Sequence, residues 1–193
     1  MTRRAITSTV LAAAIAAPAF VYAQKATEKV TEKAFVSGGR IELWLSAGEF
    51  NIRPSADNRI RVTLTESIGN TKVELTANGT QGKVVLRDTP NNNFGAVIEV
   101  PKTSDLVIRM WAGDLSVMDI TGNKDIEIKA GDIRIAADPG SYAKVDASVS
   151  VGDLSAGPFG DVKGSFLSKS VNWSGRGKFT LRASLGAGDL KFQ

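Results

Sequence analysis

The chain has 193 residues, of which 42% are hydrophobic, and it carries 24 Lys and Arg against 20 Asp and Glu. It contains no Cys and no His, so it can form no disulfide and lacks the commonest general base near neutral pH. Ser- and Cys-based catalytic triads are therefore excluded, and the sequence contains no phosphate-binding loop or dinucleotide fingerprint.

Residues 1–23 have the organisation of a secretory signal peptide. Arg3 and Arg4 precede an Ala-rich apolar run, and Val21-Tyr22-Ala23 supplies small residues for a cleavage site. The run is too short to remain as a membrane anchor. The sequence thus predicts export, by the general or the twin-arginine route, to the periplasm, the cell surface or the medium. Cleavage lowers the net formal charge from +4 to +2, and with no basic cluster among aromatic residues we expect no nucleic-acid binding.

Residues 24–37 are predicted to be a polar lead-in that becomes a strand near Phe35, and residues 38–193 to be a single domain. In that domain hydrophobic residues alternate with polar ones, as they do in half-buried strands. The clearest alternating runs are 41–45, 60–64, 73–75, 84–86 and 98–100, with turn signals at 69–70, 78–79 and 89–93.

A glycine–acid dipeptide recurs five times in one local pattern, with apolar positions on both sides. The five pairs are Gly48-Glu49, Gly113-Asp114, Gly131-Asp132, Gly152-Asp153 and Gly188-Asp189. At each pair the alternation of apolar residues shifts by one position, which in a straight strand would turn the apolar face to solvent. The chain must therefore bend or bulge there, and Gly permits the positive φ that a bend requires.

Two geometries satisfy this shift: a two-residue hairpin, and a corner of a parallel β-solenoid. Gly131 follows Gly113 by 18 residues and Gly152 follows Gly131 by 21, which favours stacked coils, whereas the 65 residues between Gly48 and Gly113 favour antiparallel meanders. We therefore predict an all-β fold. Its C-terminal half would be a β-solenoid or β-roll with Gly-Asp corners, and its N-terminal half an antiparallel, sandwich-like structure.

The stretch Val97–Pro101, the strand-like Asp105–Ile108 and the successive Ala-Gly-Asp units resemble the bacterial "putative adhesin" family of β-strand-repeat envelope proteins. The resemblance covers residues 38–192. It implies a β-solenoid or roll exported to the cell envelope, and it implies no particular biochemical role. The chain departs from the family pattern at Glu49, where the family prefers Asp.

The repeated acids suggest a structural role, in which each carboxylate caps its own turn. Two functional readings stand beside it. Stacked coils would align the carboxylates along one edge, where Ca²⁺ could relieve their repulsion. Paired acids can also cleave glycosides, although acids that belong to a repeat are poor catalytic candidates.

Trp44 and Trp111 fall on the polar side of their strands and are candidate surface contacts. An outward Trp can stack on a sugar or anchor a partner, but more commonly a neighbouring strand or the lead-in covers such a side chain. Trp173 presents the same alternatives.

The sequence thus predicts a non-enzymatic envelope protein, a rigid repeat scaffold for adhesion or for contact with a protein or surface. It predicts no catalytic residue, cofactor, bound metal or membrane span after signal cleavage. The expected partner is an envelope protein or glycan, and open edge strands would allow self-association. The alternative is a carbohydrate-active or Ca²⁺-dependent glycan-binding β-solenoid protein.

Overall fold

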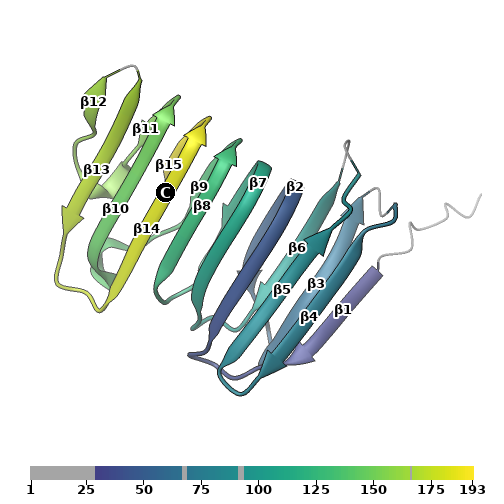
Figure 1. The fold of residues 1–193 in the computed structure, drawn as a ribbon. Coiled ribbons are helices and arrows are strands. Elements are labelled where there is room, and N and C mark those ends of the chain that lie inside the picture. Colours follow the sequence, from purple (N-terminus) through teal and green to yellow (C-terminus); the bar gives the residue numbers. More distant parts are fainter. Residues whose placement is uncertain (1–28, 67–68, 91–93, 166) are drawn as a thin grey trace, which may run out of the picture.

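The computed structural model describes residues 29–66, 69–90, 94–165 and 167–193 (Figure 1). The expected signal peptide at residues 1–23 lies outside these ranges. Within them the regular structure is β-strand apart from two short 3₁₀ turns, so the all-β prediction is confirmed. No helix in the described ranges is long and apolar enough to cross a membrane.

The strands fall into a first group that precedes the closely spaced repeats and a second that contains them. The first group is β1 (Lys29–Ala34), β2 (Arg40–Pro54), β3 (Arg59–Glu66), β4 (Lys72–Asn78), β5 (Gln81–Arg87) and β6 (Gly95–Val100). The second is β7 (Asp105–Val117), β8 (Lys124–Ala130), β9 (Ile133–Ile135), β10 (Tyr142–Val151), β11 (Leu154–Ser155), β12 (Lys163–Ser165), β13 (Ser168–Ser174), β14 (Phe179–Ala187) and β15 (Leu190–Phe192). The 3₁₀ turns are η1 (Pro139–Ser141) and η2 (Gly157–Phe159).

All the strands belong to one open sheet, because β2 and β7 run without interruption through both of its parts. One part, here called the front layer, has the order β4-β5-β2-β7-β8-β14-β10-β13-β12. The other, the back layer, has the order β1-β3-β6-β2-β7-β9-β15-β11 and lies behind the first in Figure 1. The layers contact each other through the core. A methyl group on Gly82 of β5 would stand 2.7 Å from the side chain of Ile60 on β3.

The shift in alternation at Gly48 keeps both halves of β2 facing the same core. Ile41 and Leu43 are buried in the front layer, and Phe50 and Ile52 are buried in the back layer. Each such side chain contributes about 1.5–3 kcal/mol by leaving water, which stabilises the bend that the shift requires.

The chain turns a corner at these glycines and does not form hairpins. The strands β8 and β9 flank Gly131 but do not pair with each other. Instead, both lie parallel to β7, on either side of its own bend at Gly113.

The N-terminal half differs from the antiparallel meander expected for it. The pairs β1/β3, β3/β6 and β4/β5 are antiparallel, but β5 and β6 both lie parallel to β2. The physical reason is the length of β2, which spans both layers. Its residues 40–45 pair with β5 in front, and residues 49–54 pair with β6 behind.

In the C-terminal half the order of strands in space differs from their order in the chain. The strand β14 lies between β8 and β10 and is parallel to both, so the unit at Gly188 separates those at Gly131 and Gly152. The spacing in the sequence predicted that the units at Gly131 and Gly152 would stack directly on each other. They do not stack directly, because β13 occupies one edge of β10 and β14 occupies the other, where it separates β10 from β8.

Part of the predicted lead-in is a strand in the structure. Residues Lys29–Ala34 form β1, which pairs antiparallel with β3, and Phe35 is buried in the core. The strand thus begins earlier than the sequence suggested, while the domain boundaries themselves stay predictions.

Candidate binding surface

The five glycine–acid pairs lie in one row across the sheet, in the spatial order Gly48, Gly113, Gly131, Gly188, Gly152. Their φ angles lie between +108° and +149°, where side chains are disfavoured. For each of the last four glycines in this spatial order, an added methyl group would also stand 1.9–2.0 Å from the carbonyl oxygen of the glycine before it in the row. Glycine is therefore required at those four positions by conformation and by close contact.

Two carboxylates of the row, those of Asp132 and Asp189, cap a neighbouring unit, which for these two corrects the expectation that each acid caps its own turn. Asp132 Oδ1 accepts a hydrogen bond of 3.0 Å from the backbone N–H of Asp189. Asp189 Oδ1 accepts one of 3.0 Å from the N–H of Asp153, and Asp153 forms an ion pair with Lys169. The reason is the register, which brings the N–H of one unit within reach of the carboxylate in the next.

Asp132 and Asp189 therefore have a structural role between units. The described ranges contain no group of three or more Asp, Glu, His or Cys side chains placed to hold a metal ion.

Trp44 and Trp111 project from the outer surface of the front layer, on the adjacent strands β2 and β7. Their side chains are 47% and 69% exposed, so the common expectation that neighbouring segments cover outward Trp does not apply to them. Trp173 is different, because it is half-buried and its ring packs edge-on against Phe159 at 5.2 Å between centroids.

A hollow of about 410 Å³ lies between the two exposed indoles. Trp44 stands in register with Val85 on one side and Arg109 on the other. The next outward residue along β2 is the small Ser46, whose hydroxyl donates a 2.9 Å hydrogen bond to the Leu86 carbonyl. A small side chain among larger neighbours therefore forms the floor of the hollow.

The charged residues that line the hollow are all cationic: Lys83, Arg87 and Arg109. Lys83 Nζ lies 5.8 Å from the centroid of the Trp44 ring, a cation–π contact. Arg109 is held in place by hydrogen bonds to the Asp125 backbone and carboxylate. In the described part of the chain, neither Lys83 nor Arg87 has a carboxylate oxygen within ion-pair distance. These two cations are therefore available to a ligand.

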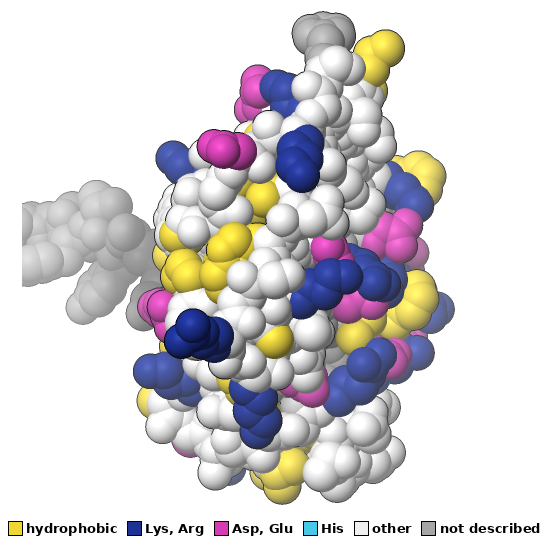
Figure 2. Space-filling model, turned by 90° about the vertical axis from the view of Figure 1, so that its left-hand side faces the viewer, with side chains coloured by type: hydrophobic (Ala, Val, Ile, Leu, Met, Phe, Trp, Pro, Cys, Tyr) yellow, Lys and Arg dark blue, Asp and Glu magenta, His cyan; other side chains and the backbone are white. Residues whose placement is uncertain are grey.

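This local excess of positive charge is not repeated at the β12–β13 end of the molecule or along β8. Seen from the β12–β13 end, Lys and Arg side chains are interspersed with Asp and Glu (Figure 2). On the outer face itself, Arg109 contacts acids of the neighbouring strand β8.

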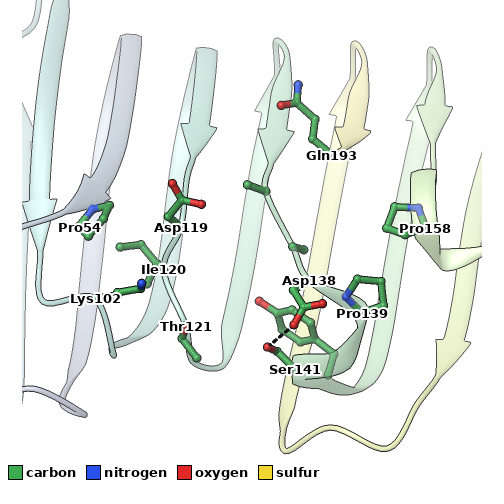
Figure 3. Close-up of a pocket in the computed structure, with 13 residues that line it drawn as sticks. Pro54, Lys102, Asp119, Ile120, Thr121, Asp138, Pro139, Ser141, Pro158 and Gln193 are labelled. Carbon is green, nitrogen blue, oxygen red and sulfur yellow. Dashed lines mark hydrogen bonds between the residues drawn. The ribbon is translucent and has the colours of Figure 1, made fainter.

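A larger hollow of about 650 Å³ lies where the back-layer strands end (Figure 3). Pro54, Asp119, Pro158 and Gln193 lie around it. The carboxylate of Asp138 is occupied, because it accepts hydrogen bonds from the N–H of Gly140 and the hydroxyl of Ser141 at the start of η1.

Lys124, which was missed by sequence reasoning, does not line this second hollow but contacts Tyr142, which does. Its side chain points into the core, in register with Leu106 and Leu181, and is 2% exposed. Its ammonium donates hydrogen bonds to the Ile120 carbonyl at 2.6 Å and to the Tyr142 hydroxyl at 2.5 Å. The sequence did contain a signal for this burial, because Lys124 falls on the same side of the alternation as the buried residues Ile126 and Ile128.

Burial shifts the pKa values of both members of this pair. Desolvation lowers the pKa of Lys124 to about 8, although the charge of Asp105 opposes the shift. Desolvation likewise raises the pKa of Tyr142 to about 12. Because both residues are only 2% exposed and Lys124 does not line the hollow, we assign the pair to the core.

Among solved structures, the chain is similar to a crystal structure described as a putative cell adhesion protein from Clostridium sporogenes. The two share 13% identity over 86% of this chain and 100% of the other, with a TM-score of 0.53. This similarity shows a common fold and carries no information on ligand. The resemblance to "putative adhesin" proteins drawn from the repeat is thereby confirmed at the level of fold.

Two further crystal structures, described as putative adhesins from Parabacteroides distasonis and Parabacteroides merdae, cover 86% and 87% of this chain. The alignments cover 69% and 82% of those chains at 9% and 10% identity, each with a TM-score of 0.29, which is too low to support an argument. No protein-family model and no curated protein matches the sequence.

Proposed function

We propose that the protein is an exported, non-enzymatic β-solenoid that uses the hollow around Trp44 and Trp111 for adhesion-type binding. The observation that carries this proposal is the exposure of two indoles on adjacent, rigidly paired strands, with cations around them. Exposed aromatic side chains set in a well-ordered surface are typical of binding sites.

The scaffold part of the proposal rests on the row of glycine–acid pairs. Parallel strands repeat in register on both sides of this row, as the coils of a solenoid do. Stacking of repeated units gives a stiff surface, because each unit is fixed by its neighbours. The indoles therefore keep a constant separation, which favours binding without a loss of conformational entropy in the protein.

The non-enzymatic part rests on how the acids and cations are used. Asp132 and Asp189 bind backbone N–H groups of neighbouring units, and the charged residues in the hollow are all cationic. A cationic and aromatic surface can hold a ligand, but it supplies neither the paired carboxylates of a glycosidase nor an acidic Ca²⁺ site.

An envelope protein or glycan is the proposed partner, in the periplasm or at the cell surface, as the signal-like residues 1–23 suggest. Self-association through sheet edges is the weaker part of the prediction. At one end of the sheet the edge strands β1 and β4 carry Lys29, Glu32, Lys33, Lys72 and Glu74, and charged edge residues discourage pairing between copies at that end.

The proposal is tested by mixing the purified processed protein with washed envelope fragments from the cells that make it, and measuring the bound fraction. The Trp44→Ala/Trp111→Ala double variant is expected to lose most of the binding while retaining its melting temperature. Arg182→Ala, an exposed change elsewhere on the front layer, is the control and should bind normally. Equal binding by the double variant and the wild type would refute the proposal.

A further inference from the structure

The hollow around Trp44 and Trp111 combines apolar planes with accessible positive charge, and this combination restricts its ligand. An indole face packs well against a flat C–H surface, such as one face of a pyranose ring. Arg87 and Lys83 add donors that suit a carboxylate, since a guanidinium can bind both of its oxygens.

We infer that the hollow binds an acidic saccharide, a glycan whose sugar rings carry carboxylates, and that it does so without a metal ion. The inference rests on the proposed function and specifies the ligand of the same site. Trp111, the more exposed indole, stacks on a sugar ring, and Arg87 pairs with the carboxylate.

Arg109 has a different role from Arg87. Its guanidinium donates to the Asp125 backbone at 3.0 Å and to the Asp125 carboxylate at 3.1 Å, and it lies 3.7 Å from Glu127. These contacts neutralise its charge and fix it as part of the wall beside Trp44. Lys83 and Arg87 therefore supply the charge that a ligand meets.

The distribution of acids distinguishes a compact ligand from an anionic membrane surface. Glu42, Asp125 and Glu127 project from the same outer face of β2 and β8, just outside the hollow. These acids pair with Arg40, Arg109 and Lys129, so a flat anionic bilayer laid on this face would meet little unpaired positive charge outside the hollow. A short saccharide meets only the cations, and a volume of about 410 Å³ lies within the range of small-ligand sites.

Calorimetric titration of the purified processed protein tests the inference. The probes are tetragalacturonate, a mannuronate tetramer and sialyllactose, with the methyl ester of tetragalacturonate as the matched uncharged ligand. We expect at least one acidic probe to bind in the presence of a chelator. Its methyl ester should bind about tenfold more weakly or not at all, and added salt should weaken the acidic probe.

Variants assign the contacts. Trp111→Ala and Arg87→Ala should each weaken binding by about tenfold or more, whereas Arg182→Ala should bind as the wild type does. Failure of all three acidic probes, or equal affinity for acid and ester, would overturn the inference. So would Trp111-dependent binding to phosphatidylglycerol vesicles with no saccharide binding. In each of these cases the envelope-binding test can still succeed, so failure of the ligand class is distinguishable from failure of the proposed function.

Discussion

The row of glycine–acid pairs and the hollow around Trp44 and Trp111 are built on the same strands, yet their residues are constrained differently. In the row, Gly131 lies against the carbonyl of Gly113 with no room for a methyl group. In the hollow, the side chains project into solvent with space between them. Residues that repeat thus stabilise the fold, and outward residues that do not repeat are free to bind.

The largest effect is expected from removing residues 179–193, which form β14 and β15. Within the sheet β14 lies between β8 and β10, and β15 lies between β9 and β11, so loss of this segment would leave β8 and β10 each with one unpaired edge and would open the core. The buried side chains that it contributes are Leu181, Ala183, Leu185, Leu190 and Phe192. We predict that the shortened chain shows no cooperative thermal transition by circular dichroism.

Removal of the other end of the described chain is the matched control. Truncation through Ala34 takes away β1, which pairs along one edge only and is mostly exposed. That variant should retain a cooperative transition at a lower temperature. Similar behaviour of the two truncated chains would contradict a central position for β14.

The next largest effect is expected for Gly131→Ala. Its φ of +128° and the 1.9 Å approach of a methyl group to the Gly113 carbonyl should together cost about 4 kcal/mol or more in the free energy of unfolding. Gly79→Ala is the control, because φ is +55° but nothing lies within 4 Å, so it should cost only about 1 kcal/mol. Urea denaturation measures both values, and equal losses would show that the close stacking is unimportant.

The buried Lys124 should give the protein an unusual dependence on pH. Between its folded pKa of about 8 and its ordinary pKa of 10.5, the unfolded chain holds a proton that the folded protein has released. Stability should therefore rise with pH across this window, by about 3 kcal/mol in total. Above pH 10 it should fall again, because Tyr142 keeps its proton in the folded protein up to about 12.

Urea denaturation at a series of pH values measures this slope. Lys124→Met places an apolar side chain in register with Leu106 and Leu181 and should abolish the rise. An unchanged slope in that variant would assign the effect to another group.

The smallest effect on stability is expected in the hollow. Trp111→Ala removes a side chain that is 69% exposed, so the free energy of unfolding should change by about 0.5 kcal/mol or less. Thermal melts measure the change. A loss of several kcal/mol would place this side chain among the residues that hold the fold together.

The row of bends was predictable from the sequence because each shift in alternation has a local cause at one glycine. Which bends lie next to each other was not predictable, because the position of β14 depends on whether β10 has an edge free, a property of the whole sheet. The parallel attachment of β5 and β6 to β2 was missed for the same reason.

For the candidate site, the alternation of polar and apolar residues along the strands was enough to predict that Trp44 and Trp111 lie on the outer surface. Their neighbours Lys83 and Arg87 could not be found in this way, because they come from β5, whose pairing with β2 was not anticipated. The role of the repeated carboxylates was also misjudged, since Asp132 and Asp189 cap units distant in sequence and near only in the stack.

The most direct test of the account is the set of backbone nuclear Overhauser contacts at the glycine row in the isotope-labelled protein. We expect contacts from Gly188 to both Gly131 and Gly152, together with contacts between Gly48 and Gly113. Contacts that join Gly131 directly to Gly152, or cross-strand contacts between the segments flanking a single glycine–acid pair, would contradict it.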